Sequence, residues 1–530
     1  MLKNMLKATV FATTLALTAG AVSMPAFAEV VYNRGNSADP ESLDPHKTST
    51  VYEAHILRDL FLGLVMQDKD ANLIPGAAES WTVSDDGLVY TFKLRQGATW
   101  SDGSAVTAED FVYSFRRLED PATGAEYASM LYPIVGAEEV NTGKGKVEDM
   151  GVKAVDASTL EVSLKAPTPY FLEMLTHQAA YPVNKAAIEK LGADWIKPGN
   201  LVSNGAFTLA EFVPNDHIKL VKNPKFYDAA NVKIDVVNFI PTEDRSTAIK
   251  RFEAGELDSN DDIPTEQMAD LKAKFGDQLR VGAQLGTYYY AMKWDKEPWS
   301  NLELRKAVAM AIDRDFIAEK VWQNSMLPSY TMVPPGIEGY TPIEADYATM
   351  SQIDREDEAK KILEKLGYGP DKPLKMEIRY NTSENHKNTA VAIQEQLKPL
   401  GIEVSLVNTD TKTHYGFLEQ KGDFDTARVG WIADYKDPET FLGVARKASG
   451  NNYSVYDNPK FEEAMDKAAA SGGKPEERMK DLQEAERIVL SDTGFIPILY
   501  YSYKNLVSPK LKGFDENVMD VHPTRFMSKE

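Results

Sequence analysis

The segment that most constrains the fold lies between residues 374 and 406, where two alternating apolar runs flank a helical run. The apolar positions are Leu374, Met376, Ile378 and Tyr380 in the first run, and Ile402, Val404 and Leu406 in the second. Period-two alternation is typical of half-buried strands. Between them, a helix is expected from about residue 388 to 400, with Gly401 as its stop. A strand–helix–strand unit implies a parallel sheet covered by helices, so we expect an α/β fold.

Local signals elsewhere agree with a mixed fold. Alternating residues predict strands over 88–94 and 160–164. Thr107 to Asp110 resembles a capping box that opens a helix, and residues 355–366, closed by Gly367, form an amphipathic helical pattern.

The first 28 residues are typical of a cleavable secretory signal peptide. Lys3 and Lys7 precede an apolar run that is too short to span a membrane, and Ala26-Phe27-Ala28 forms an A-x-A cleavage site. We therefore expect export to a bacterial periplasm as a soluble protein. The 530-residue chain is long enough for about three domains or lobes at roughly 150 residues each.

Composition excludes several classes of function. The chain has no cysteine, so disulfides, thiolate metal sites and a cysteine nucleophile are impossible. Its formal net charge of −21 argues against nucleic acid as a partner. The seven histidines show no metal-ligand spacing, and we expect no metal or other cofactor. Motifs such as G-x-S-x-G and H-E-x-x-H are absent, so we predict that the protein is not an enzyme, with a secreted peptidase as the remote alternative.

The stretch from Asp425 to Tyr435 is the candidate functional segment. It is predicted to be a strand that runs into a turn, and it carries a cation, Arg428, and an anion, Asp434, six residues apart. Gly430 and Trp431 between them offer room for a second backbone and a flat apolar surface. An extended free peptide would suit such a segment, because it could pair with the strand and has one charge at each end. A core strand that ends in a surface salt bridge is the alternative.

Several motifs together resemble the family 5 extracellular solute-binding proteins. The N-terminal matches are Ala78-Glu79-Ser80-Trp81, Tyr90-Thr91-Phe92-Lys93-Leu94-Arg95, Trp100-Ser101-Asp102-Gly103 and Thr107-Ala108-Glu109-Asp110-Phe111. Further matches follow in order: Ser203-Asn204-Gly205-Ala206-Phe207, Thr287-Tyr288-Tyr289-Tyr290, Asn381-Thr382-Ser383 and the segment 425–435. The resemblance covers nearly all of the chain after residue 28 and is strongest to the oligopeptide-binding branch.

The resemblance implies a type II periplasmic-binding-protein-like fold of three lobes with mixed sheets. Lobe I should be discontinuous, made of residues 29–62, 186–285 and 500–530. Lobe II should comprise residues 63–185 and lobe III residues 286–499. The ligand cleft should be enclosed between lobes I and III. We expect a monomer that receives short peptides and delivers them to the membrane permease subunits of an ABC importer.

The resemblance also assigns roles to single residues. Asp434 matches the aspartate that holds the peptide ammonium, and Arg428 and His386 match positions that meet its carboxylate. Main-chain groups of Gly430, Ile432 and Val51 are expected to pair with the ligand backbone. The further candidates are Trp431 as pocket lining or core, and Tyr127 and Asn452 as weaker matches. His386 could instead cap the helix that starts near it.

Departures from the family pattern bear on the ligand. Enteric relatives carry a lysine where this chain has Trp322, an arginine where it has Glu419, and an asparagine where it has Asp261. The pocket is therefore expected to favour cationic side chains, unless Glu419 and Asp261 face solvent. The alternative ligands are murein tripeptide and another small non-peptide solute. The pocket should fit murein tripeptide less well than those relatives do. A cysteine pair of the family is replaced by Gly286 and Ile432.

Overall fold

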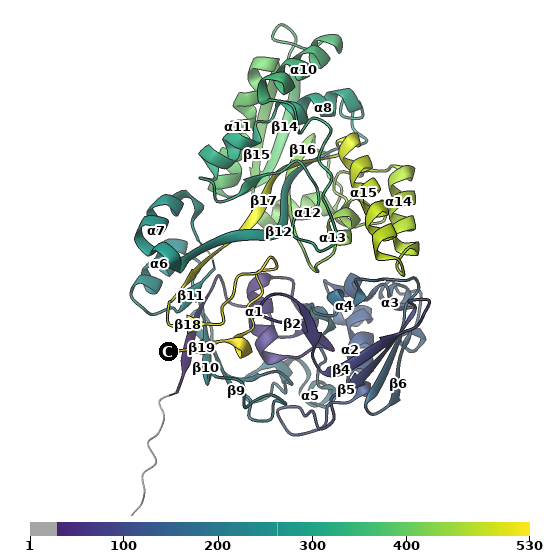
Figure 1. The fold of residues 1–530 in the computed structure, drawn as a ribbon, viewed down its shortest axis with the longest axis vertical. Helices are drawn as coiled ribbons and strands as arrows, with labels where there is room; N and C mark the ends of the chain where they lie inside the picture. The colour runs from purple at the N-terminus through teal and green to yellow at the C-terminus, as the bar shows by residue number, and fades with distance from the viewer. Residues whose placement is uncertain (1–28, 262) are drawn as a thin grey trace, which may run out of the picture.

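One long mixed sheet forms the frame of the molecule. The computed structural model describes residues 29–261 and 263–530, so the predicted signal peptide lies outside the described residues. The strand order is β15-β14-β16-β12-β17-β11-β1-β10-β9-β8, with β13 beside β17. These strands are β1 (Val31–Asn36), β8 (Phe207–Val213), β9 (His217–Lys222), β10 (Val236–Pro241), β11 (Ser259–Asn260), β12 (Leu279–Met292), β13 (Leu327–Pro328), β14 (Leu374–Asn381), β15 (Ile402–Thr409), β16 (Thr426–Ile432) and β17 (Phe495–Val507). In terms of the three lobes that we propose, strands β12 and β17 run from lobe I into lobe III (Figure 1).

The predicted strand–helix–strand unit is confirmed. Strands β14 and β15 are parallel and in register from Leu374 opposite Ile402 to Asn381 opposite Thr409. Helix α11 between them begins at Glu384, earlier than expected, and ends at Leu397. A short 3-10 turn follows, and Gly401 leaves it with a φ of +79°, a conformation that glycine adopts without strain.

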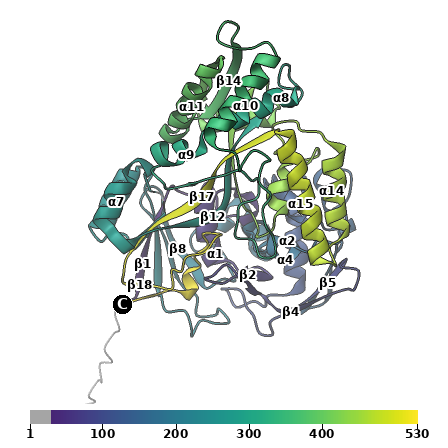
Figure 2. The ribbon, with the colours of Figure 1, turned by 45° about the horizontal axis from the view of Figure 1, so that its top comes forward.

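Lobe III encloses its part of the sheet between two helical layers (Figures 1 and 2). Its helices are α8 (Leu302–Ala311), α9 (Arg314–Phe316), α10 (Gln352–Lys365), α11, α12 (Thr411–Glu419), α13 (Glu439–Leu442), α14 (Pro459–Ala470) and α15 (Pro475–Asp492). Tyr288 and Tyr290 of β12 enter the core shared with α8, α10 and α11, whereas Tyr289 enters the core shared with α14 and α15. The tyrosine run therefore serves both faces, as expected of a central strand.

Lobe II is built on an antiparallel sheet in the order β4-β5-β7-β6. Its strands are β4 (Ala78–Val83), β5 (Val89–Leu94), β6 (Val152–Asp156) and β7 (Thr159–Ser163), and its helices are α2 (Ala108–Glu119), α3 (Ala137–Asn141) and α4 (Phe171–Met174). Helix α5 (Lys185–Leu191) begins at the boundary with the second segment of lobe I. The two strands predicted here are confirmed as β5 and β7. The capping box is also confirmed, with Thr107 as the N-cap of α2 and Asp110 as its acidic partner.

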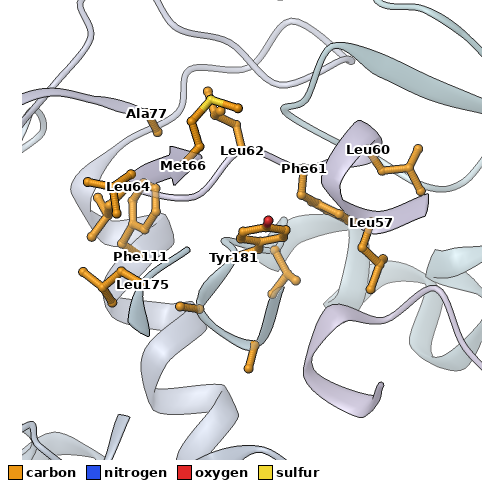
Figure 3. Packing of buried hydrophobic residues seen from close by; sticks show 14 of the residues in the cluster. Leu57, Leu60, Phe61, Leu62, Leu64, Met66, Ala77, Phe111, Leu175 and Tyr181 are labelled. Atoms are coloured by element: carbon orange, nitrogen blue, oxygen red, sulfur yellow. The ribbon is translucent and has the colours of Figure 1, made fainter. Parts of the chain in front are cut away.

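One hydrophobic core joins lobe II to lobe I. Helix α1 (Val51–Leu60) and the residues after it carry Leu57 and Phe61 toward Tyr181 and Leu175 (Figure 3). These side chains belong to a single cluster of buried residues that continues into lobe II. A close-packed core resists shear, so the two lobes form one body on this side of the molecule. The hairpin of β2 (Val65–Gln67) and β3 (Leu73–Pro75) lies beside it.

The C-terminal segment returns to the start of the described chain. Lys529 Nζ donates a hydrogen bond to the carbonyl of Val31 at 2.8 Å and pairs with Asp258 at 2.7 Å. The remaining elements of lobe I are α6 (Arg245–Glu253), α7 (Met268–Phe275), β18 (Leu511–Lys512) and β19 (Ser528–Lys529). Contacts between segments so far apart in the chain support the discontinuous lobe I that we propose.

The ladder between the two crossing strands is interrupted midway. Ala283 lies opposite Ser502, and the next aligned pair is Thr287 with Tyr500. Three residues of β12, 284–286, therefore stand opposite the single residue Tyr501. Such a bulge breaks the regular ladder and bends a strand, and it falls where the strands pass between the lobes. We propose this interruption as the hinge.

Candidate functional site

Strand β16 has a free edge over part of its length. It pairs with β12 along its whole length, from Thr426 opposite Met292 to Ile432 opposite Gly286. On its other side, β14 pairs with Thr426 and Ala427 alone. Within the described residues, no named strand pairs with positions 428–432 on this side. The expected strand is confirmed, and its second half could receive another strand.

The main chain of Gly430 and Ile432 points to this free edge. Neighbouring residues of a strand direct their main-chain groups to opposite sides. The N–H of Ala433 donates to Leu285 O of β12 at 2.9 Å, so the even-numbered residues of β16 face away from β12. Consistent with this parity, His414 Nε2 lies 2.9 Å from Arg428 O on the free side. Gly430 and Ile432 therefore hold the positions from which β16 could pair with an extended ligand.

Arg428 is a buried cation that has no acidic partner in the described part of the chain. Its side chain is 5% exposed, and its guanidinium lies 4.6 Å from the ring centre of Tyr288. Nη1 donates to Asn381 and to the Tyr415 hydroxyl, each at 3.2 Å, and Nη2 donates to the Tyr501 hydroxyl. Buried charges are normally paired, so this site is suited to an anion that comes from outside the fold.

The donors that Arg428 leaves unused form a fork. A guanidinium has five N–H groups, and three of them are donated to the neighbours above. Within the described residues, Nε has no hydrogen-bond partner although it is buried, and Nη2 makes one of its two possible hydrogen bonds. Parallel N–H groups of this kind match the two oxygens of a carboxylate.

His386 lies beside this fork as a neutral imidazole. It is the third residue of α11, whose N-cap is Ser383, so it does not cap the helix. Its Nδ1 is 3.3 Å from the Tyr288 hydroxyl, and its ring lies 6.4 Å from that of Trp322. Burial, and then the Arg428 cation, lower the pKa of His386 to about 2. His386 can therefore contribute a hydrogen bond to a ligand at neutral pH.

Asp434 is the anionic counterpart at the other end of the segment. Its side chain is half-buried and forms no ion pair within the described residues, while its main-chain N–H donates to Thr440 Oγ1 at 3.4 Å. Burial raises the pKa of Asp434 to about 7, and the Glu439 carboxylate adds to the shift. A ligand cation would relieve both effects.

Two aromatic candidates lie close to Asp434. Burial, and then the Asp434 charge, raise the pKa of Tyr127, which stacks on His177 with ring centres 4.7 Å apart. Tyr127 therefore brings the segment 63–185 close to Asp434. Trp431 is half-buried against the lobe III core and donates its indole N–H to Thr440 at 3.2 Å. Trp431 therefore packs partly against the core, beside the Thr440 hydroxyl that also accepts the N–H of Asp434.

The remaining candidates, Val51 and Asn452, lie outside β16 and its turn. Val51 is the first residue of α1 and is 59% exposed. Asn452 is buried, and its amide is hydrogen-bonded to main-chain groups of Ala445, Arg446 and Tyr456. Because Asn452 stabilises its own loop, we leave it out of the proposed peptide site.

The three positions at which the charge differs from that of enteric relatives, Asp261, Glu419 and Trp322, have different surroundings in the structure. Asp261 is 3.9 Å from Arg34 and 3.5 Å from His55, so a neighbouring cation already offsets its charge. Glu419 is exposed at the end of α12, one helical turn beyond the Arg428 partner Tyr415. Trp322 is buried and donates its indole N–H to Thr389 at 3.0 Å.

Sequence reasoning did not identify the tyrosines that surround Arg428. Tyr415 and Tyr501 hold its guanidinium and Tyr288 stacks on it, yet only Tyr288 was noted, as part of a family match. Gly430 was predicted to leave room for a second backbone, whereas in the structure the space beside it is taken by side-chain atoms. A Cβ there would collide with the Tyr501 hydroxyl and approach Arg428 Nη2 to 3.0 Å.

Comparison with known proteins decides the family. A model of the bacterial extracellular solute-binding proteins, family 5 middle region, matches residues 72–453. The chain belongs to this family. Gly286 and Ile432, which replace the family cysteine pair, lie directly opposite each other in the ladder of β12 and β16. The type II periplasmic-binding-protein fold is likewise confirmed by solved structures of relatives.

Two curated family 5 relatives match nearly the whole chain. The periplasmic oligopeptide-binding protein OppA of Escherichia coli (strain K12) is 40% identical over 494 residues, 91% of this chain and 89% of that protein. The periplasmic murein peptide-binding protein MppA of the same strain is 38% identical over 493 residues, 92% and 91% of the two chains. A solved structure of Haemophilus influenzae OppA in complex with RPPGFSPFR is 37% identical, covers 94% of this chain and 99% of that chain, and has a TM-score of 0.82.

Residues 29–261 and 263–530 contain neither a metal-binding cluster nor a helix suited to cross a membrane. No group of three or more histidine or acidic side chains is arranged to hold a metal ion in this part of the chain. None of the helices described there combines the length and the apolar character needed to cross a membrane.

Proposed function

We propose that this family 5 protein captures short peptides in the periplasm and delivers them to an ABC importer. The observation that carries the proposal is the pair of charges on β16 and its turn. Arg428 and Asp434 both lack an ion-pair partner within the described residues, and the free strand edge lies between them. A peptide offers the complementary carboxylate, ammonium and main-chain groups. Main-chain pairing accepts many sequences.

The separation of Arg428 and Asp434 along the chain is compatible with the length of a short peptide. Six residues separate Arg428 from Asp434, which is at most about 20 Å in an extended strand. A tri- to pentapeptide spans roughly 10 to 17 Å at the same rise per residue. The likeness to OppA supports this ligand class.

Murein tripeptide is the second candidate ligand. The likeness to MppA favours it, since that protein is a murein peptide-binding protein with 38% identity to this chain. Trp322 and Glu419 favour ordinary peptides, because they replace two cations that would meet extra ligand carboxylates.

The family and the N-terminal segment support export and delivery. Relatives of this chain are periplasmic binding proteins, and residues 1–28 supply the cleavable signal. We propose that the protein works as a monomer with the permease subunits of its importer.

Mass spectrometry of material that co-purifies with the protein from the periplasm tests the function. We expect short peptides, and calorimetry with synthetic tri- and tetrapeptides should then show saturable binding. Recovery of intact peptide after incubation separates a binding protein from a peptidase. A protein that takes up none of these peptides would contradict the proposal.

Peptide binding should close the molecule. Lobes I and III are connected by the crossing strands with the interruption at residues 284–286, and hinge closure is the usual response of such lobes to a ligand between them. Small-angle scattering with saturating peptide should give a smaller radius of gyration than without. An unchanged profile, with binding confirmed in the same sample, would count against a closing hinge.

Cationic side chains should be favoured over acidic ones. A charge 5 to 6 Å from a ligand group is worth about 3 kcal/mol at a dielectric of about 20, and desolvation and ordering reduce this to about 1 kcal/mol. Because Arg34 offsets Asp261, the preference should come from Glu419. Tripeptides with Lys should therefore bind on the order of tenfold more tightly than those with Glu.

A competition series of Lys, Gln and Glu at each peptide position, at two salt concentrations, measures this preference. Glu419→Arg should reverse it at one position alone. A flat series would mean that Glu419 faces solvent without reaching the ligand.

A further inference from the structure

We propose that Tyr501 couples occupation of the Arg428 carboxylate site to the angle between lobes I and III. This rests on the proposed peptide-binding function. Tyr501 joins two features that are otherwise separate: it is the residue opposite the bulge of β12, and its hydroxyl accepts a hydrogen bond from Arg428 Nη2.

The ring of Tyr501 is confined by glycines on both neighbouring strands. A Cβ on Gly286 of β12 would meet the Tyr501 Cβ and ring at 2.9 Å, and a Cβ on Gly430 of β16 would collide with its hydroxyl. The ring therefore lies across β12 and reaches β16. Any change in the path of β12 at the bulge must move this ring, because close-packed groups transmit displacement.

The bulge is also connected to the other end of the ligand segment. Leu285, the central residue of the bulge, accepts the N–H of Ala433, which immediately precedes Asp434. The N–H of Leu285 donates to Val518 O in the C-terminal part of lobe I at 2.8 Å. The proposed hinge thus contacts both ends of the peptide site and both lobes.

The hydroxyl of Tyr501 can respond directly to a carboxylate. It accepts a hydrogen bond from Nη2, so its own O–H remains available as a donor. A carboxylate held by Nε and Nη2 of Arg428 would share Nη2 with this hydroxyl and could accept its proton in a hydrogen bond. The ligand would then fix the ring, and the ring would favour one geometry of the bulge over others. A ligand shifts such an equilibrium only through contacts that differ between the two geometries, and Tyr501 supplies one.

Tyr500 provides a matched control. It also borders the bulge, where it pairs with Thr287, but its hydroxyl is 2.7 Å from Thr331 Oγ1 and is not among the groups that hold Arg428. Tyr500→Phe removes a partly buried hydroxyl from the same strand and leaves the proposed coupling intact.

The test measures closure and affinity in the same protein. The chain has no cysteine, so Lys250→Cys on α6 and Lys360→Cys on α10 place two spin labels on exposed positions of lobes I and III (Figure 1). Inter-label distances and calorimetric affinities are compared for trialanine and trialanine amide. In the otherwise unaltered protein, trialanine should bind more tightly and shorten the distance more than the amide does.

In Tyr501→Phe, the two peptides should produce the same distance, and the ratio of their affinities should fall by about tenfold, within the range of allosteric couplings. Tyr500→Phe should behave like the parent protein. Gly286→Ala, which displaces the Tyr501 ring without removing its hydroxyl, should also abolish the difference in closure.

Three outcomes would overturn the coupling. The first is a Tyr501→Phe protein that still closes further with the acid than with the amide. The second is a Tyr500→Phe protein in which the difference in closure between acid and amide is lost as fully as in Tyr501→Phe. The third is a parent protein that binds both peptides but closes equally with them; this would leave the proposed function standing. Absence of binding by the parent protein to either peptide would instead contradict the proposed function itself.

Discussion

Asp434→Asn is expected to weaken the binding of a free tripeptide by about 2 to 5 kcal/mol, the range for removing one partner of a buried charge pair. The half-buried carboxylate of Asp434 has no cation beside it in the described residues, so the peptide ammonium would be its partner. An N-acetylated peptide lacks this charge and should bind the wild type with a comparable loss. The variant and the acetylated peptide together should lose little more than either alone, because both remove the same interaction.

The same site predicts a pH dependence. Burial raises the pKa of Asp434 to about 7, and a peptide ammonium requires its ionised form. Below that pKa a proton must leave when the peptide binds, so affinity should fall by up to tenfold per pH unit from about 7 downward. Asp434→Asn should flatten this profile. His386, whose pKa is lowered to about 2, stays neutral over this range and should not contribute.

Calorimetry at several pH values, with free and acetylated forms of one peptide, measures both effects. Thermal unfolding controls for damage. Since the ionised Asp434 carboxylate is half-buried without an ion-pair partner, Asp434→Asn should leave the stability at about pH 8 unchanged or raised. Equal affinities for the free and acetylated peptides would remove Asp434 from the ammonium site.

The parts of the fold that depend on neighbours in sequence could be predicted. Strands β14 and β15 and the helix between them follow from apolar periodicity and a glycine stop. The proposed exchange of the chain between lobes could not be derived that way, because it depends on contacts such as that of Lys529 with Val31, 498 residues apart. No local pattern distinguishes the long crossing strands β12 and β17 from strands that end within one lobe.

The site shows the same division. The residue types on β16 and the family likeness pointed to Arg428 and Asp434. Whether their charges are paired depends on the folded surroundings: Asp261 meets Arg34 across the sequence, whereas Arg428 meets the hydroxyls of Tyr415 and Tyr501. Asn452 matched a ligand position, yet its amide is hydrogen-bonded within its own loop. Sequence types alone cannot separate a free functional group from one that already has partners.

Arg428→Met is expected to weaken free-acid peptides by about 2 to 5 kcal/mol through loss of the partner of the ligand carboxylate. The unused Nε–H and one Nη2–H form the only fork that we assign to the carboxylate. A C-terminal amide should cause a similar loss in the wild type, and Arg428→Met should then cost that amide little more. Arg428→Lys keeps a charge but loses the parallel N–H groups. Its affinity for the free-acid peptide should therefore lie between that of Arg428→Met and that of the wild type.

The acid and amide forms of one tripeptide, titrated against the three proteins, give this cycle directly. Circular dichroism and thermal unfolding are needed beside it, because Asn381, Tyr415 and Tyr501 lose a donor in Arg428→Met. A variant that is destabilised but still discriminates acid from amide would show that Arg428 serves the fold and that another group holds the carboxylate. If the variant folds and binds the acid and the amide with equal affinity, the buried guanidinium serves to bind the ligand carboxylate. This is consistent with the absence of an anion beside it in the described fold.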